Sequence, residues 1–150
     1  MKSFSLPMRD DTDRPVVYLS LPYRLTALLD TGAVFPVWTQ EEPLLKSFGA
    51  VLLQHNVPFG GFGGMTTGHL YRIPNFCIGE MIVPSLPVIV SPRRLPCQLL
   101  LSATVFSRLI YEIDDQNHTL NVNVPDTESL IRNLNIVDEN GRLHVFCTSA

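Results

Sequence analysis

Charged side chains are scarce in this sequence. Aspartate, glutamate, lysine and arginine make up 17% of the 150 residues, whereas about a quarter is usual for a globular protein. The 11 basic residues form no run or stripe, and the formal net charge is −3. Because nucleic-acid binding needs a basic surface, we expect no nucleic-acid partner. The low charge also indicates that a partner covers some apolar surface.

Long apolar segments are also absent. The apolar stretches are short and broken by proline, so none is long enough to span a membrane as a helix. Residues 1–15 lack the apolar region that is typical of a secretory signal peptide. We therefore expect no membrane partner and a cytoplasmic location.

Cysteine is rare, with three widely spaced residues, Cys77, Cys97 and Cys147. An odd number at wide spacing is a poor disulfide framework and lacks the rhythm of zinc ligands. The four histidines form no HExxH motif. The sequence therefore predicts no metal and no other cofactor, and it favours buried or inert thiols.

Short stretches of β-branched and aromatic residues between prolines and glycines are abundant, which is typical of strands. The sequence has 12 prolines, no internal repeat and no low-complexity linker. We expect one all-β domain spanning residues 1–150, with one short helix at Ala103–Arg108. The pattern also predicts hairpins at 109–124 and 136–146, short helices at Glu41–Phe48 and Asp126–Leu134, and strand breaks at Pro74 and Pro84.

One motif carries a carboxylate out of an apolar strand and places it beside a glycine: Ala27–Ala33, ALLDTGA. Gly32 permits a sharp turn, and the Thr31 hydroxyl can bind neighbouring groups. Asp30 is then either a turn-capping residue, as aspartate often is, or a catalytic group. Two carboxylates about 3 Å apart share one proton, so that one activates water while the other donates a hydrogen bond to a carbonyl.

A second motif is rich in glycine. Phe59–Met65, FGGFGGM, places two glycine pairs around Phe62. Such a segment is either a flexible surface loop or the tip of a mobile hairpin whose backbone N–H groups reach a peptide carbonyl. A phosphate-binding loop is disfavoured because no helix signature follows.

A third segment, Leu99–Phe106, is mostly apolar and is followed by Ile110–Asp114. The three segments, in this order, resemble those of a retropepsin, the single-domain retroviral-type aspartic protease. The resemblance covers residues 16–124 and implies a pepsin-like, closed β-barrel-type fold. It implies that Asp30 is catalytic and that a flap closes over the substrate. The implied active-site loop is Thr31, Gly32 and Ala33, and the implied flap is Gly60, Gly61, Phe62, Gly63 and Gly64.

The sequence departs from that family in two places. Ser102 stands where the family has a glycine, and serine is the smallest polar replacement. The active-site loop continues with Val34 and Phe35, where many retroviral members have acidic residues that pair with an arginine of the helix. Here the helix has Ala103 and Thr104. Because the charged partners are missing on both sides, we expect apolar packing at this end of the loop.

The resemblance also bears on assembly. The shared-proton mechanism needs two aspartates, and no other aspartate has both the apolar lead-in and the glycine. A two-fold homodimer would supply the second Asp30, with a polypeptide substrate lying across both copies. Strands at Phe4–Leu6 and Leu143–Cys147 either interleave between the copies, as in the family, or pair within one chain. We expect an aspartic endopeptidase; the alternative is a peptide-binding or dimerisation module of the same fold with little or no activity.

Overall fold

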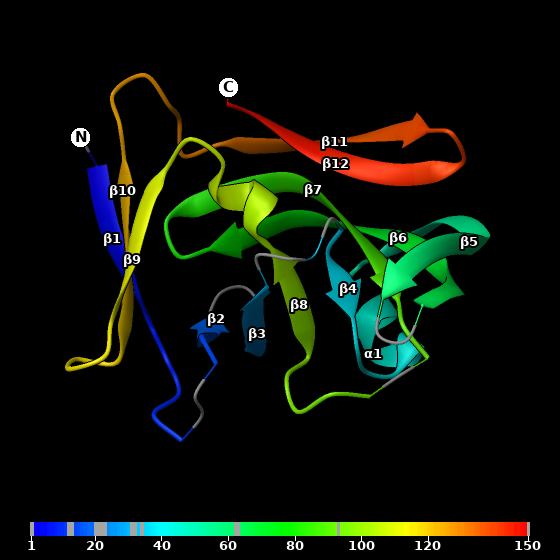
Figure 1. Cartoon of the computed structure of the whole chain (residues 1–150), viewed down its shortest axis with the longest axis horizontal. Coiled ribbons are helices and arrows are strands. Elements are labelled where there is room, and N and C mark those ends of the chain that lie inside the picture. The colour runs from blue at the N-terminus through cyan, green and yellow to red at the C-terminus, as the bar shows by residue number, and fades with distance from the viewer. Residues whose placement is uncertain are drawn as a thin grey trace.

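A computed structural model describes residues 2–11, 14–19, 24–30, 33, 35–61, 64–92 and 94–149 of the chain. Strands dominate this part of the chain (Figure 1), which confirms its mostly β character. The strands are β1 (Lys2–Pro7), β2 (Val16–Leu19), β3 (Leu25–Asp30), β4 (Val37–Trp38), β5 (Val51–Gly61), β6 (Gly64–Ile78), β7 (Met81–Val90), β8 (Leu99–Ser102), β9 (Ile110–Asp114), β10 (Thr119–Val124), β11 (Arg132–Glu139) and β12 (Arg142–Ser149). The helical segments are α1 (Glu42–Ser47) and the 3-10 helix η1 (Ala103–Phe106), near two of the three predicted positions.

The largest sheet has seven strands in the order β2-β3-β8-β4-β7-β6-β5. β3 and β8 lie side by side and run parallel (Figure 1), so that Ala27 is opposite Leu99 and Asp30 is opposite Ser102. The chain between them, β4 to β7, returns to the same sheet on the far side of β8. β2 and β5 are the two edges, and no pairing between them closes the sheet within the described residues.

Two smaller sheets contain the first and last strands. β1 pairs with β10, and β10 pairs with β9 in the first predicted hairpin. β11 and β12 form the second predicted hairpin, which is longer than expected and runs from Arg132↔Ser149 to Glu139↔Arg142. Both terminal strands therefore pair within their own chain, each along one edge.

The helix predicted at Asp126–Leu134 is wrong, because the segment turns and enters β11 at Arg132. The hydroxyl of Ser129 accepts a hydrogen bond from the backbone N–H of Ile131 at 3.0 Å. The backbone N–H of Ser129 donates to the hydroxyl of Ser149 in β12. Serine side chains compete in this way with the hydrogen bonds of a helix.

The strand breaks predicted at Pro74 and Pro84 are also wrong, since β6 and β7 run through them. Proline has no N–H group and is tolerated in a strand where no neighbour needs that donor. Pro74 lies beyond the last residue of β6 that pairs with β5. Pro84 lies opposite Asn75, a pair that is missing from the β6–β7 ladder. Pro84 therefore falls at a gap in the ladder, and Pro74, which pairs with Ser85 of β7, has no partner in β5.

Two aromatic side chains fix α1 to the sheet. Trp38 is fully buried, and its Nε1–H donates to the carbonyl of Glu41 at 3.0 Å, just before the helix. Tyr71 of β6 is 1% exposed, and its hydroxyl donates to the carboxylate of Glu42 in the first helical turn. Leu45 from the same helix is buried in the main core. The short helix is therefore stabilised by tertiary contacts, as helices of this length must be.

A buried arginine links the C-terminal hairpin to η1. The side chain of Arg132 is 0% exposed. Its Nε donates to the carbonyl of Val105 at 3.1 Å, and its Nη2 donates to the carbonyl of Ser107. Its Nη1 lies 3.4 Å from the carboxylate of Glu128. These bonds satisfy both the guanidinium, which is costly to bury unpaired, and carbonyls at the end of η1.

We expect Arg132→Met to destabilise the protein by about 1–3 kcal/mol, the usual cost of leaving a buried polar group without a partner, because Glu128 keeps its ion pair with Arg108. The carbonyls of Val105 and Ser107 also lose their donors. Urea denaturation measures the change. Arg9→Met is the matched control, because Arg9 binds Asp11 at the surface, where ion pairs contribute little. An equal loss in both variants would contradict the role of Arg132.

A second prediction concerns Tyr71. Burial and the hydrogen bond to Glu42 raise its pKa from 10.0 to about 12. Because the folded-state pKa is the higher one, this interaction stabilises the fold fully below pH ~10 and is lost as the pH rises to about 12. Ultraviolet titration should show one tyrosine ionising near pH 12, and Tyr71→Phe should remove that step. A titration unchanged by Tyr71→Phe would show that the assignment is wrong.

Candidate active site

Asp30 is the last residue of β3, and its parallel neighbour β8 ends beside it at Ser102. Leu29 and Leu101, the residues that precede them, are buried in the main core. Asp30 itself is half-buried. A carboxylate therefore stands at the common end of two parallel strands, on a backbone that tight packing holds in place.

The turn after Asp30 is fixed at its far end. The backbone N–H of Ala33 donates to the carbonyl of Asp30 at 3.2 Å. The carbonyl of Ala33 accepts a hydrogen bond from the hydroxyl of Ser102 at 2.9 Å. Thr31 and Gly32, which complete the expected active-site loop, lie outside the described residues. The loop thus begins on β3 and is held by β8.

Ser102 occupies the position of the glycine in the family pattern, and the structure gives it three contacts. It is 1% exposed, and its Oγ accepts from the backbone N–H of Thr104 at 3.3 Å, which caps η1. The same oxygen lies 2.9 Å from Oγ1 of Thr104 and donates to Ala33. One hydroxyl therefore joins the loop, the strand and the helix by bonds that glycine cannot make.

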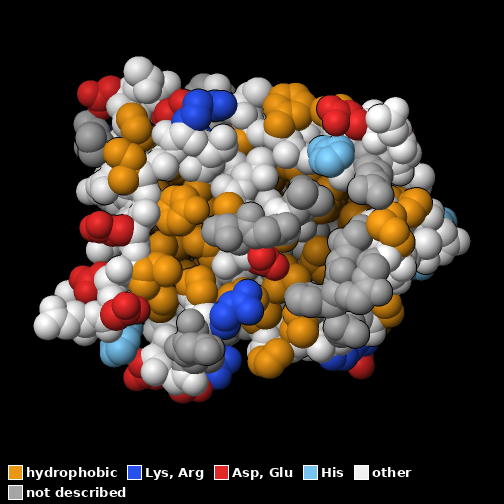
Figure 2. Space-filling model, in the orientation of Figure 1, with side chains coloured by type: hydrophobic (Ala, Val, Ile, Leu, Met, Phe, Trp, Pro, Cys, Tyr) orange, Lys and Arg blue, Asp and Glu red, His pale blue; other side chains and the backbone are white. Residues whose placement is uncertain are grey.

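An apolar cluster lies along the face of the sheet that ends at Asp30. Its buried members include Val37 and Leu100, against which Leu28, Phe59 and Leu95 pack. Leu28 precedes Asp30 by two residues and pairs with Leu100, so their side chains share one face of the sheet. Hydrophobic side chains gather over the central part of the face in Figure 2, and most acidic ones lie toward its edges.

The chain beyond the loop is held by apolar packing. Phe35 is 3% exposed and lies in a cluster with Val57 of β5 and Ile89 of β7. This is the packing expected where the charged partners of retroviral members are missing. Val34 lies outside the described residues.

The glycine-rich segment forms the end of the β5–β6 hairpin. The two strands stay paired up to Gly60↔Met65 and Gly61↔Gly64. Phe62 and Gly63, the expected tip, lie outside the described residues. The alternative of an irregular surface loop therefore does not hold for the flanks of this segment, which are strands.

A further glycine brings the hairpin close to the sheet. A Cβ atom at Gly68 would lie 2.2 Å from the carbonyl oxygen of Val90 and 3.1 Å from the ring of Phe59. No side chain fits at 2.2 Å from a backbone oxygen, so the close approach of β6 to β7 requires glycine. Sequence reasoning did not single out Gly68, although a glycine inside a strand often marks such an approach.

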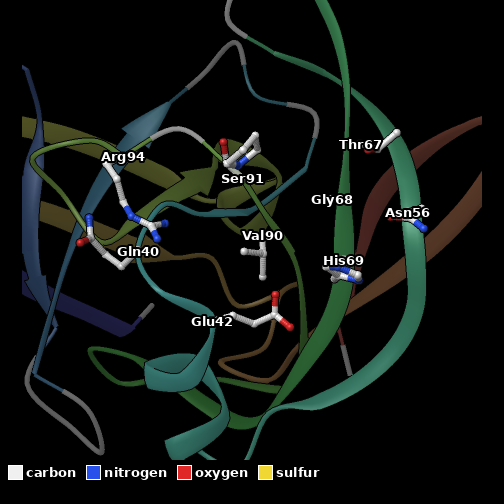
Figure 3. A pocket seen from close by; sticks show the side chains of 10 residues that line it. Gln40, Glu42, Asn56, Thr67, Gly68, His69, Val90, Ser91 and Arg94 are labelled. Atoms are coloured by element: carbon white, nitrogen blue, oxygen red, sulfur yellow. The ribbon is translucent and has the colours of Figure 1, made fainter.

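A pocket of about 300 Å³ lies at the root of this hairpin (Figure 3). It is lined by Gln40, Glu42, Asn56, Thr67, Gly68, His69, Val90, Ser91, Pro92 and Arg94. Asp30 is not among these residues, so the pocket is separate from the candidate catalytic carboxylate. The sequence did not predict it, because its walls come from segments far apart in the chain.

All three cysteines, Cys77, Cys97 and Cys147, have free thiols. Burial raises the pKa of Cys97 and of Cys147, which keeps both in the less reactive thiol form.

No helix in the described part of the chain has the length and apolar character needed to cross a membrane.

Comparison with known proteins supports the fold. No family model matches the sequence, and no curated protein matches it. The crystal structure of a retropepsin-like aspartic protease from Rickettsia conorii is similar to this structure, with a TM-score of 0.55. The match covers 81% of this chain and 89% of that chain at 16% sequence identity. The similarity is one of fold, and it confirms the resemblance to retropepsin-like proteases at that level.

We expect Ser102→Gly, which restores the family glycine, to destabilise the protein by about 1–2 kcal/mol, because it removes the cap of η1 and the bond to Ala33. Urea denaturation measures the loss. Ser47→Ala is the control, since the Ser47 hydroxyl bonds to the carbonyl of Leu44 at an exposed position and should matter less. A Ser102→Gly variant as stable as the parent would contradict the linking role of this hydroxyl.

Proposed function

We propose that this chain, as one domain of residues 1–150, is an aspartic endopeptidase that acts as a homodimer with one Asp30 from each copy. The placement of Asp30 carries the proposal. This carboxylate ends a strand that is paired in parallel with β8, and it begins a turn anchored by Ser102. The retropepsin-like fold supports the same function.

In the proposed dimer the two Asp30 carboxyl groups face each other across a two-fold axis. At about 3 Å both cannot be ionised, so they share one proton. The ionised group takes a proton from water, whose oxygen attacks the peptide carbonyl carbon. The protonated group donates a hydrogen bond to the carbonyl oxygen. The intermediate then breaks at the C–N bond, with a proton going to the leaving amine, and no acyl-enzyme forms.

The proposed substrate is an extended polypeptide with apolar side chains beside the cut bond. Leu28 and Phe59, which are half-buried in the apolar cluster on the face that ends at Asp30, suit such side chains. An extended peptide is held by main-chain hydrogen bonds, with alternate side chains in pockets. In this proposal the β5–β6 hairpin is the flap, and its glycine-rich end supplies backbone N–H groups to the peptide.

The strand order is compatible with a dimer. β1 and β12 each pair along one edge within their own chain, and within the described residues no strand is paired in a sheet with the other edge. An unpaired edge can accept a strand from another molecule. We therefore propose that each terminal strand pairs along one edge with its own chain and along the other edge with the second copy.

The departures from the family pattern support a second candidate, a peptide-binding or dimerisation module with little or no activity. Ser102 replaces the glycine of the pattern, and the loop charges of many retroviral members are missing. Such a module would bind peptides without cutting them. A cleavage assay distinguishes the two candidates.

We expect Asp30→Asn to lower peptide cleavage by at least about 10²–10⁴-fold, the range for loss of general acid–base catalysis. The readout is turnover of a peptide library followed by mass spectrometry. Asp115→Asn is the matched control, because Asp115 is exposed in the β9–β10 turn, and it should cleave like the parent. Sedimentation should show the parent as a dimer at micromolar concentration.

Two results would decide against the protease. Cleavage that persists in Asp30→Asn would remove Asp30 from the mechanism. A parent that binds peptides with no cleavage over a full pH series would favour the binding module.

A further inference from the structure

Two histidine rings meet across the root of the β5–β6 hairpin. Nδ1 of His55 lies 2.8 Å from Nδ1 of His69. The ring centroids are 4.8 Å apart and the planes are nearly perpendicular, at 87°. His55 is exposed and His69 is half-buried at the pocket shown in Figure 3. Solvent therefore reaches the pair.

A β-bulge creates this pairing. The ladder passes from Gln54↔Leu70 to Val57↔Gly68, so His55 and Asn56 together lie opposite His69 alone. Asn56 has a positive φ of 53°, a conformation that asparagine tolerates better than most residues. Bulges re-aim side chains, and here the extra residue brings the Nδ1 atoms of the two histidines into contact.

The two facing nitrogens can hold only one small cation between them. A hydrogen bond between two imidazoles needs one donor and one acceptor, so a single proton lies between the two Nδ1 atoms. A metal ion can replace that proton, because neutral imidazole is a good ligand for Zn²⁺, Cu²⁺ and Ni²⁺.

We propose that His55 and His69 form a binding site for a divalent transition-metal ion that joins β5 to β6. Zinc–nitrogen bonds are about 2.0–2.1 Å long, so two nitrogens bound to one ion at angles of 90–110° are roughly 2.8–3.4 Å apart. The observed 2.8 Å lies at the lower end of this range. Little movement of either strand is needed.

The surroundings fit an open site with weak affinity. Within the described residues no group of three or more histidine, cysteine, aspartate or glutamate side chains could hold a metal, so water completes the coordination. The adjoining pocket includes one acidic and one basic side chain, Glu42 and Arg94, whose opposite charges leave no net repulsion against a cation.

The site would make the hairpin root stiffer, since each ligand belongs to a different strand. This consequence does not depend on catalysis by Asp30. If the hairpin is the flap of a protease, the ion would also slow the movement of the flap. This second consequence rests on the proposed function.

The test uses ZnCl₂ as the probe, with isothermal titration calorimetry and thermal unfolding of the intact chain near pH 7.5. We expect one ion per chain and a rise in Tm of about 5–10 °C at 100 times the Kd. His55→Gln and His69→Gln should each weaken binding about tenfold or more, because one of two ligands is lost. His118→Gln and His144→Gln are matched controls and should bind like the parent.

A second readout identifies the atoms. Nitrogen NMR of the imidazoles should show Zn²⁺ coordinated through Nδ1 of both histidines. Binding of equal strength in His55→Gln and His69→Gln would overturn the proposal. So would an absence of binding by the folded parent at millimolar ZnCl₂.

Discussion

The parallel pairing of β3 with β8 is the constraint on which the rest of the structure depends. Its register places Asp30 beside Ser102, and a slip of one residue would turn the carboxylate to the other face of the sheet. Parallel strands need a long crossover, and here the crossover contains α1 and the glycine-rich hairpin. One pairing therefore positions the carboxylate, anchors its loop and returns the hairpin to the same sheet.

A chain of polar contacts links the C-terminal hairpin to the loop that follows Asp30. Ser102 joins the carbonyl of Ala33 to the start of η1, and buried Arg132 from the C-terminal hairpin binds carbonyls near the end of that helix. The C-terminal hairpin thus contributes to the support of the candidate site through η1. The β5–β6 hairpin is positioned in another way. β6 approaches the backbone of β7 closely at Gly68, and β5 contains a β-bulge at His55.

Much of the fold could be predicted from local pattern. Strands, both hairpins and the helix near residue 45 follow from alternation, turn residues and proline at a helix start. The strand breaks predicted at Pro74 and Pro84 were wrong, because whether a strand tolerates proline depends on the neighbouring strands. The sequence alone does not reveal those neighbours. The helix predicted at Asp126–Leu134 failed because the backbone N–H of Ser129 and the side chain of Arg132 form tertiary bonds instead. The segment around Asp30 was recognisable as a motif, whereas the His55–His69 contact depends on a bulge that leaves no clear mark in the sequence.

The central claim is that one site is built from two copies of Asp30. Mixing the parent with the Asp30→Asn chain and allowing subunits to exchange tests it most directly. Random pairing in an equal mixture leaves about one quarter of the dimers with two intact aspartates. The account predicts that cleavage per parent chain falls to about half in that mixture, and toward zero with excess variant. Activity that stays proportional to the parent chain at every ratio would contradict it.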